Sequence, residues 1–126
     1  MRSKYDPAES LADIIENADR IESYLAGMDR DTFAGNGLVR DAIERCLERV
    51  CEAAHRLGAQ ADELMPDQPW GDVRGMGNRR LRHAYDRLSL DVIWNAAHHD
   101  LPGLAADARR ALAQLRATRQ PSEPER

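Results

Sequence analysis

The chain has 126 residues and a formal net charge of −4, with two Trp, three Tyr and one Phe. This length supports one domain with one hydrophobic core, and the acidic balance argues against a protein that coats nucleic acid through a basic overall surface. The N-terminal residues lack the apolar run of a signal peptide, and no run of about 18 apolar residues occurs that would cross a membrane. The sequence therefore predicts a soluble, cytoplasmic protein without a membrane segment.

Ala, Leu, Arg and Glu dominate the chain and β-branched residues are few, which is typical of helices packed on helices. Apolar residues recur at steps of three and four from residue 6 to about residue 27, which predicts a first helix with one buried stripe. Residues 29–37 read as a break or a weak first turn. The longest apolar stripe follows from Val39 to Leu57 and predicts the central helix of the core.

Residues 59–65 carry one or two further turns before Pro66 and Pro69, and a third main helix is predicted to begin near Trp70. A short helix is expected over 90–97, with Ser89 as its N-cap and residues 98–100 as its end. Asp100 is then expected to cap a final helix whose stripe reaches Leu115. The prediction is an all-α antiparallel bundle of four main helices and one short helix in residues 1–117, followed by a disordered tail in residues 118–126.

Cys46 and Cys51 are the two cysteines, and five residues of helix separate their directions by about 140°. This spacing matches no CxxC metal or redox site, so both are predicted to be reduced packing residues. His98 and His99 are adjacent and diverge on a helix, which favours a solvated helix end over a metal site. Trp70 and Trp94 fall on apolar stripes and are interpreted as core or interface residues rather than as stacking platforms for bases. No metal or nucleotide cofactor is assigned.

The segment from Arg74 to Arg87 is strongly basic within this acidic chain, with five arginines against the single acid Asp86. It also holds the imidazole of His83 and the phenol of Tyr85. These groups suit RNA cleavage without a metal, in which histidine moves protons near neutral pH and arginine neutralises a phosphate. An arginine-rich segment is also typical of a solvated helix face, and residue types alone leave both interpretations open.

Several motifs occur in a fixed order along the chain. They are Leu11-Ala-Asp-Ile-Ile15, the stretch Arg40–Ala54, Pro69-Trp70, Val73-Arg-Gly-Met-Gly-Asn78, Arg82-His-Ala-Tyr-Asp86 and Leu90-Asp-Val-Ile-Trp94. In this combination the chain resembles the HepT-like toxins of the HEPN superfamily from about Leu11 to Leu115.

The resemblance implies a HEPN-type helical fold and a ribonuclease toxin of a toxin–antitoxin system, active as a homodimer with an RNA cleft. The family's motif is Arg-x(4–6)-His-x-Tyr, and its antitoxin is a minimal nucleotidyltransferase, MntA, that transfers AMP to the motif tyrosine. Carried over by position, the catalytic histidine is His83 and the AMPylated tyrosine is Tyr85. Arg80 and Arg82 are expected to bind the RNA phosphates.

No arginine stands at the spacing that the family motif permits before His83, because those three positions hold Met76, Gly77 and Asn78. Arg79, which has three residues between it and His83, is one turn from His83 on a regular helix and would share its face. Arg74, with eight residues between, is the other candidate, and the sequence keeps both as catalytic candidates. The departure also leaves a second hypothesis, a non-catalytic HEPN module that only binds a nucleotidyltransferase partner.

Overall fold

A computed structural model describes residues 6–71, 73 and 90–119 of the chain. Every regular element in these ranges is helical, which confirms the all-α prediction. The elements are α1 (Pro7–Leu25), α2 (Arg30–Ala34), α3 (Gly37–Leu57), α4 (Ala59–Leu64), α6 (Leu90–Asn95), the π-helix η1 (Ala96–Asp100) and α7 (Leu101–Arg119). Of the third predicted main helix, only its start at Trp70 and Gly71 and the helical Val73 fall within these ranges.

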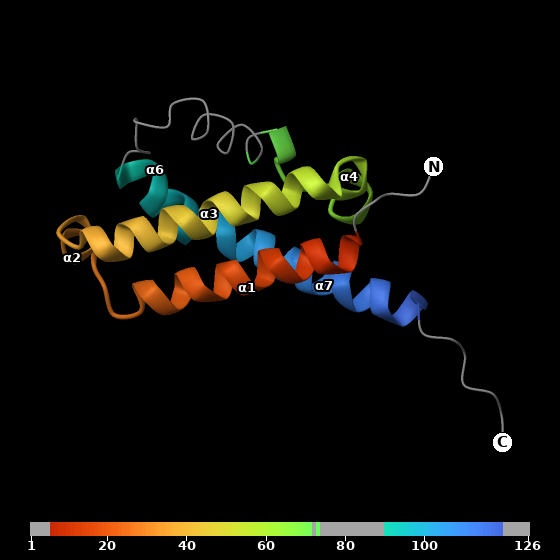
Figure 1. Cartoon of the computed structure of the whole chain (residues 1–126), viewed down its shortest axis with the longest axis horizontal. Helices are drawn as coiled ribbons and strands as arrows, with labels where there is room; N and C mark the ends of the chain where they lie inside the picture. The colour runs from red at the N-terminus through yellow and green to blue at the C-terminus, as the bar shows by residue number, and fades with distance from the viewer. Residues whose placement is uncertain (1–5, 72, 74–89, 120–126) are drawn as a thin grey trace, which may run out of the picture.

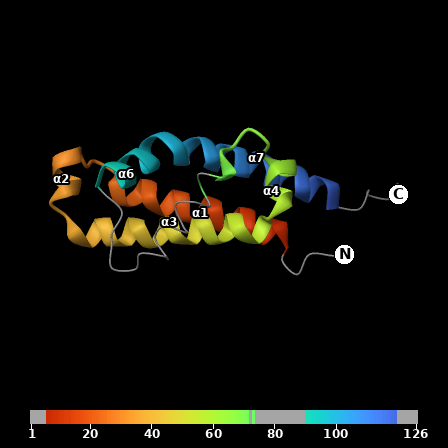
Figure 2. The same cartoon turned by 90° about the horizontal axis from the view of Figure 1, so that it is seen from above.

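Helix α1 lies between the two other long helices of the described chain. Figure 1 shows α1 and α3 running side by side in opposite directions, and Figure 2 shows α7 on the far side of α1 from α3. The buried stripes of the three helices meet in one core, which includes Leu11, Ile14, Ile43, Val50 and Leu104. The sequence stripes therefore identified the faces that pack.

Local hydrogen bonds fix where α1 begins and how its start meets the end of α7. The Asp6 carboxylate accepts the backbone N–H of Ala8 at 3.0 Å, and Pro7 occupies the first turn, where its missing N–H is not needed. Arg119 in the last turn of α7 forms an ion pair of 2.9 Å with Asp6. The pKa of Asp6 lies below its usual range. The hydrogen bond from the Ala8 N–H is the largest cause, and the hydrogen bond from Arg119 is the next.

Helix α3 is buried over about half of its circumference, which is wider than the stripe of an ordinary surface helix. Cys46, Val50 and Leu57 lie on one side of this band, and Glu44, Leu47 and Cys51 lie on the other. The helix begins after Asn36, whose side chain accepts the Val39 N–H at 3.1 Å, and ends at Gly58, where φ is +55°. A glycine tolerates this left-handed backbone without strain.

The short helix α2 closes one end of the bundle over α6. Asp29 caps it by accepting the Thr32 N–H at 2.8 Å, and Phe33 is fully buried with its ring centroid 5.3 Å from that of Trp94. Arg30 forms an ion pair with Asp91 on α6. The segment predicted as a break or a weak turn is thus a five-residue helix that holds α6 in place.

The C-terminal helices are continuous, so the predicted break at residues 98–100 and the Asp100 cap are wrong. Asp100 is the last residue of η1, and Leu101 donates its N–H to the Ala96 carbonyl five residues back. Pro102 in the next turn lacks an N–H, and the wider π turn accommodates that missing donor without ending the helix. The Ser89 cap lies outside the described residues.

Helix α7 also runs beyond the predicted boundary at residue 117, because Thr118 and Arg119 remain helical. Thr118 Oγ1 donates to the Gln114 carbonyl at 2.8 Å. Residues 120–126 lie outside the described residues, so the disordered tail stays a prediction. No helix in the described ranges has the length and apolar character needed to cross a membrane.

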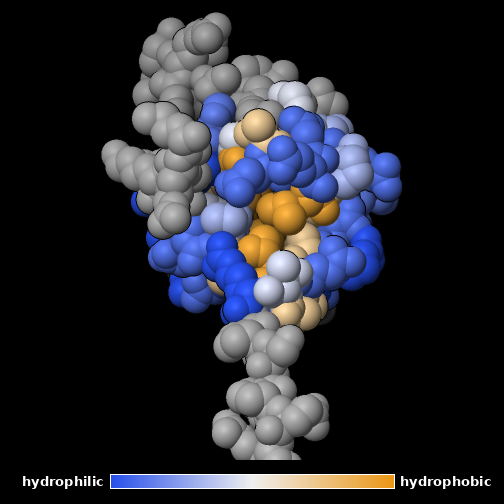
Figure 3. All heavy atoms as spheres, turned by 90° about the vertical axis from the view of Figure 1, so that its right-hand side faces the viewer, coloured by the Kyte–Doolittle hydropathy of each residue, from blue (hydrophilic) through white to orange (hydrophobic). Residues whose placement is uncertain are grey.

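Apolar surface remains visible at the end of the bundle where α1 begins, α4 lies and α7 ends, surrounded by hydrophilic side chains (Figure 3). The partly buried hydrophobic residues of these three helices are Ala8, Ala12, Ile15, Tyr24, Leu64 and Leu115. In this view the apolar spheres lie together near the centre of the face.

Replacing Phe33 with Ala removes the ring that packs on Trp94 and leaves a cavity beneath α2. We expect Phe33→Ala to lower the free energy of unfolding by about 3–5 kcal/mol in urea denaturation. Leu38→Ala is the matched control, since Leu38 lies only a few residues away but is 83% exposed. A change within about 0.5 kcal/mol is expected for it. Equal effects of both variants would contradict the role given to α2.

Candidate functional site

The six residues predicted to carry chemistry lie outside the described residues, so the structure neither brings them together nor separates them. They are Arg74, Arg79, Arg80, Arg82, His83 and Tyr85. What the structure describes is the two borders of this segment, at Val73 and at Leu90, and the part of the bundle that holds them. The geometry of these borders limits where a site can be built.

The first border, at Val73, is fixed on the side of α3 that carries Glu44, Leu47 and Cys51. Trp70 is 3% exposed, and its Nε1–H donates to the Met65 carbonyl at 2.9 Å. Val73 donates its N–H to the Pro69 carbonyl at 3.1 Å, as in a helical turn, and its own carbonyl accepts the Cys51 thiol at 3.1 Å. The chain therefore enters the predicted catalytic segment from a point fixed to α3 at Cys51, and the core role predicted for Trp70 is confirmed.

Both cysteines are buried, which confirms that they are packing residues. Cys46 lies on the α1 side of α3. Burial raises the pKa of the Cys46 thiol, although the neighbouring guanidiniums of Arg49 and Arg20 oppose the rise. A thiol in such surroundings is a poor nucleophile at neutral pH, so Cys46 is not a reactive residue.

The second border, at Leu90, is held by aromatic packing on α6. The Trp94 ring packs against both Phe33 and His98, and its centroid is 4.0 Å from that of the His98 ring. His98 Nδ1 donates to the Trp94 carbonyl at 2.9 Å. This confirms the packing role predicted for Trp94. His98 and His99 are both exposed, and within the described ranges no group of three or more His, Cys, Asp or Glu could hold a metal.

Glu44 is a candidate that the sequence analysis missed. It is only 3% exposed, and it lies on the same side of α3 as Cys51, because seven residues make nearly two helical turns. A buried carboxylate requires hydrogen-bond donors or a cation to compensate for the lost hydration. The sequence signal was the position of Glu44 three residues before Leu47, inside the wide buried band of α3.

A cavity of about 230 Å³ lies next to Val73, between α3 and the start of α7. Its walls are mainly apolar, with Leu47, Val50 and Leu104 among them, and the exposed His99 and Asp100 also line it.

The two thiols are natural probes of the first border. In the folded protein we expect a thiol-specific disulfide reagent to modify Cys51 faster than Cys46. Local opening at Val73 releases the contact that holds the Cys51 thiol, whereas exposing Cys46 requires α1 and α3 to separate. The rates are measured by intact mass on Cys46→Ala and Cys51→Ala, and both thiols should react fully in denaturant. Faster reaction at Cys46 would show that Val73 is not the weaker of the two contacts.

Comparison with known proteins gives consistent matches over most of the chain. The family model described as "Ribonuclease HepT-like" matches residues 14–111. A protein of Methanocaldococcus jannaschii named "Putative RNase MJ1380" is 30% identical over 79% of this chain and 91% of its own length. A protein of Thermococcus cleftensis named "Probable ribonuclease HepT" is 29% identical over 82% of this chain and 90% of its own.

No solved structure gives a significant match to the chain. The family match nevertheless covers α3, both borders and the whole segment between them, and it confirms the family expected from the sequence motifs. This chain belongs to the HepT-like ribonuclease family.

Proposed function

We propose that this protein is a ribonuclease toxin that cleaves RNA without a metal ion and acts in the cytoplasm as a homodimer. A minimal nucleotidyltransferase of the MntA kind is proposed to neutralise it by AMPylation. The observation that carries the proposal is the match to the ribonuclease HepT-like family over residues 14–111, which includes His83 and Tyr85. The two relatives named as ribonucleases align with this chain over nearly the whole of their own length.

In the proposed reaction, a base removes the proton from a ribose 2′-OH, and the oxygen attacks the adjacent phosphorus. The 2′-O–P bond forms as the P–O5′ bond breaks, and an acid protonates the departing 5′-oxygen. The products are a 2′,3′-cyclic phosphate and a 5′-hydroxyl. His83 is assigned to one of the two proton transfers, and Arg79 or Arg74 stabilises the charge that develops on the phosphate.

Arg80 and Arg82 are proposed to bind flanking phosphates of the RNA, because guanidiniums match phosphate oxygens and remain charged. The buried carboxylate of Glu44 offers a counter-charge to one arginine of this basic segment. Its place on the Cys51 side of α3, where Val73 is fixed, supports that role. Glu44 is therefore a proposed positioning residue, since it would act through another side chain.

Neutralisation is proposed to take place at Tyr85. Its phenol oxygen attacks the α-phosphorus of ATP bound by the nucleotidyltransferase, a tyrosyl–AMP bond forms, and pyrophosphate leaves while the phenolic proton passes to solvent. The attached nucleotide adds bulk and negative charge two residues from His83. Both effects oppose the approach of an RNA phosphate.

A second candidate function is a non-catalytic HEPN module that only binds the nucleotidyltransferase. The observation in its favour is the absence of an arginine at the three positions that the family motif permits before His83. A domain without that arginine keeps its fold and partner surface but loses transition-state stabilisation at the phosphate.

Replacing His83 with Ala is the direct test between the two functions. We expect His83→Ala to lower the rate of RNA cleavage by about 10² to 10⁴-fold, since it removes one general acid or base. His55→Ala is the matched control, because His55 is exposed near the end of α3. A chelator should not affect the wild-type rate. A purified, unmodified dimer without ribonuclease activity would contradict the proposal.

The wild type and the His83→Ala variant can also be compared in cells by their effect on growth. Induction of the wild-type gene alone should arrest growth, and His83→Ala should not. With the partner present, intact protein mass should increase by one AMP group, and Tyr85→Phe should abolish that increase. Arrest by His83→Ala as strong as by the wild type would favour the non-catalytic module.

The two candidate arginines can be separated by single substitutions. Replacement with Ala of the arginine that contacts the phosphate should lower cleavage by about 10² to 10³-fold, as for loss of one transition-state donor. We expect this for Arg79→Ala, which is one helical turn from His83, and a smaller effect for Arg74→Ala. Lysine at the same position should rescue poorly, because it cannot reproduce the planar donor pair. The opposite order would assign the role to Arg74.

A further inference from the structure

A polar cleft of about 280 Å³ lies between α1 and α3. It is lined by three carboxylates and three guanidiniums, those of Asp13, Glu16, Glu52, Arg20, Arg49 and Arg56, so its charges cancel. Two of these pairs are internal: Arg56 contacts Asp13 at 2.6 Å, and Arg20 contacts Glu16 at 3.4 Å. Arg49 and Glu52, one turn apart on α3, form no ion pair within the described residues, and Arg49 lies within hydrogen-bond reach of the Cys46 thiol.

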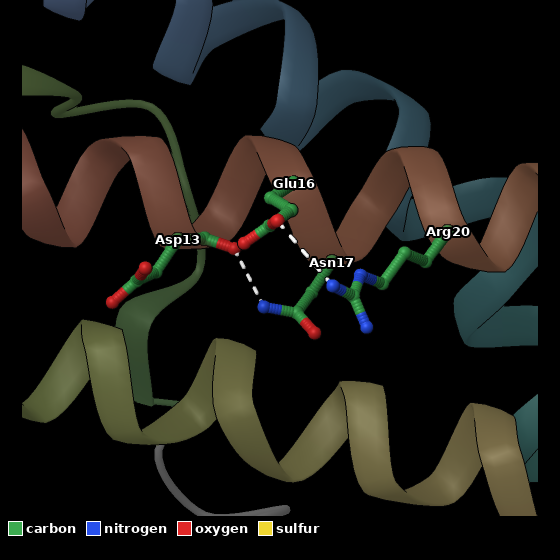
Figure 4. A network of polar contacts seen from close by, with 4 residues as sticks. All are labelled: Asp13, Glu16, Asn17 and Arg20. Atoms are coloured by element: carbon green, nitrogen blue, oxygen red, sulfur yellow. Dashed lines mark hydrogen bonds and ion pairs between the residues drawn. The ribbon is translucent and has the colours of Figure 1, made fainter.

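The deepest group in this cleft is Asn17 of α1, which is only 4% exposed. Its Nδ2 donates to the Asp13 carbonyl at 2.8 Å, and Figure 4 shows the side chain extending from α1 toward α3. That bond also fixes the orientation of the amide, since a flipped amide would place two oxygens against each other. Oδ1 is then left buried without a hydrogen-bond partner in the described part of the chain.

A buried carbonyl oxygen without a donor is costly, so a ligand group that donates a hydrogen bond is expected at this point. The ligand should carry no net charge, because the cleft carries none. It must offer acceptors to Arg49 and donors to Glu52 and Asn17. A neutral planar ring with adjacent acceptors on one edge and adjacent donors on the next meets all three requirements.

From this arrangement we propose that the α1–α3 cleft binds one unpaired base of single-stranded RNA, with guanine preferred. Guanine presents its N7 and O6 acceptors side by side, which suits the planar donors of Arg49. Its N1–H and N2–H donors suit the Glu52 carboxylate and Asn17 Oδ1. Adenine and cytosine place an acceptor beside the donor on that edge, so they pair poorly with a carboxylate.

The size of the cleft fits this assignment. Its volume lies just below the range of about 300–1,000 Å³ that is usual for drug-sized ligands, so it suits one ring system rather than a whole nucleotide strand. Splayed bases of single-stranded RNA commonly stack on guanidinium planes, and Arg20 and Arg56 supply such planes at the cleft walls. The inference deepens the proposed function, because it names the RNA feature that a second surface reads.

The test is a titration of the ¹⁵N-labelled protein with guanosine 5′-monophosphate, followed through the Asn17 side-chain amide resonances. Asn17→Ala assigns these resonances. We expect a saturable shift with guanosine monophosphate and none with adenosine monophosphate. Arg49→Ala should weaken guanosine monophosphate binding about tenfold or more, as for loss of a bidentate base contact. Arg45→Ala is the matched control, because Arg45 lies on the same helix but pairs with Glu48 outside the cleft.

Equal shifts with both nucleotides would overturn the proposal, as would an unchanged affinity in Arg49→Ala. No shift with either nucleotide would mean that water alone satisfies Asn17 and would also overturn it. The readout does not depend on cleavage. RNA cleavage without guanosine monophosphate binding would remove only this inference, whereas binding without cleavage would remove the ribonuclease and leave the base site.

Discussion

The structure depends on α3 being buried over half of its circumference. One side of the buried band packs on α1, and the other side carries Glu44, Leu47 and Cys51. The second side contacts the chain at Val73, through the Cys51 thiol. Because one rigid helix serves both contacts, a change in the α1–α3 packing alters the support of the segment that is proposed to cleave RNA.

The π-helix explains how the C-terminal part keeps α6 and α7 in one piece. An α-helix through Pro102 would lose a hydrogen bond and place the ring against the preceding turn. In η1 the Leu101 N–H instead reaches the Ala96 carbonyl, so the turn widens just before the proline. Trp94 then remains against Phe33 while Leu101 and Leu104 face the core. The second border of the candidate segment is thus fixed by the same helix that completes the bundle.

The sequence predicted the packing faces well because burial follows helical periodicity, as in the stripes of α1, α3 and α7. The prediction failed at Asp100 because a short polar residue before Leu-Pro has the pattern of an N-cap. The helix continues through Asp100 because of tertiary contacts made by Trp94 and Leu101, which local sequence does not reveal. Glu44 was missed for a related reason. Its burial comes from the width of the α3 band, and periodicity counts apolar residues rather than the sides from which a helix is covered.

The candidate site was predictable only as residue types and a family motif. The motif identifies His83 and Tyr85 by position, but choosing between Arg74 and Arg79 needs the backbone path between them. Asn17 had no sequence signal, because a single asparagine in α1 differs little from a solvated one. Its burial depends on the approach of α3, and its orientation depends on a bond to the backbone at Asp13.

The α1–α3 cleft and the border of the candidate segment at Val73 lie on different sides of α3. Arg49 is two residues before Cys51, so on a regular helix their side chains point about 160° apart. A strand that places a base in the α1–α3 cleft must therefore pass over α3 before it reaches the border at Val73. We therefore expect the base in the cleft not to be the one beside the cleaved bond. Selection of a guanine would act on which strands are held, while the chemistry at His83 would remain indifferent to the base beside it.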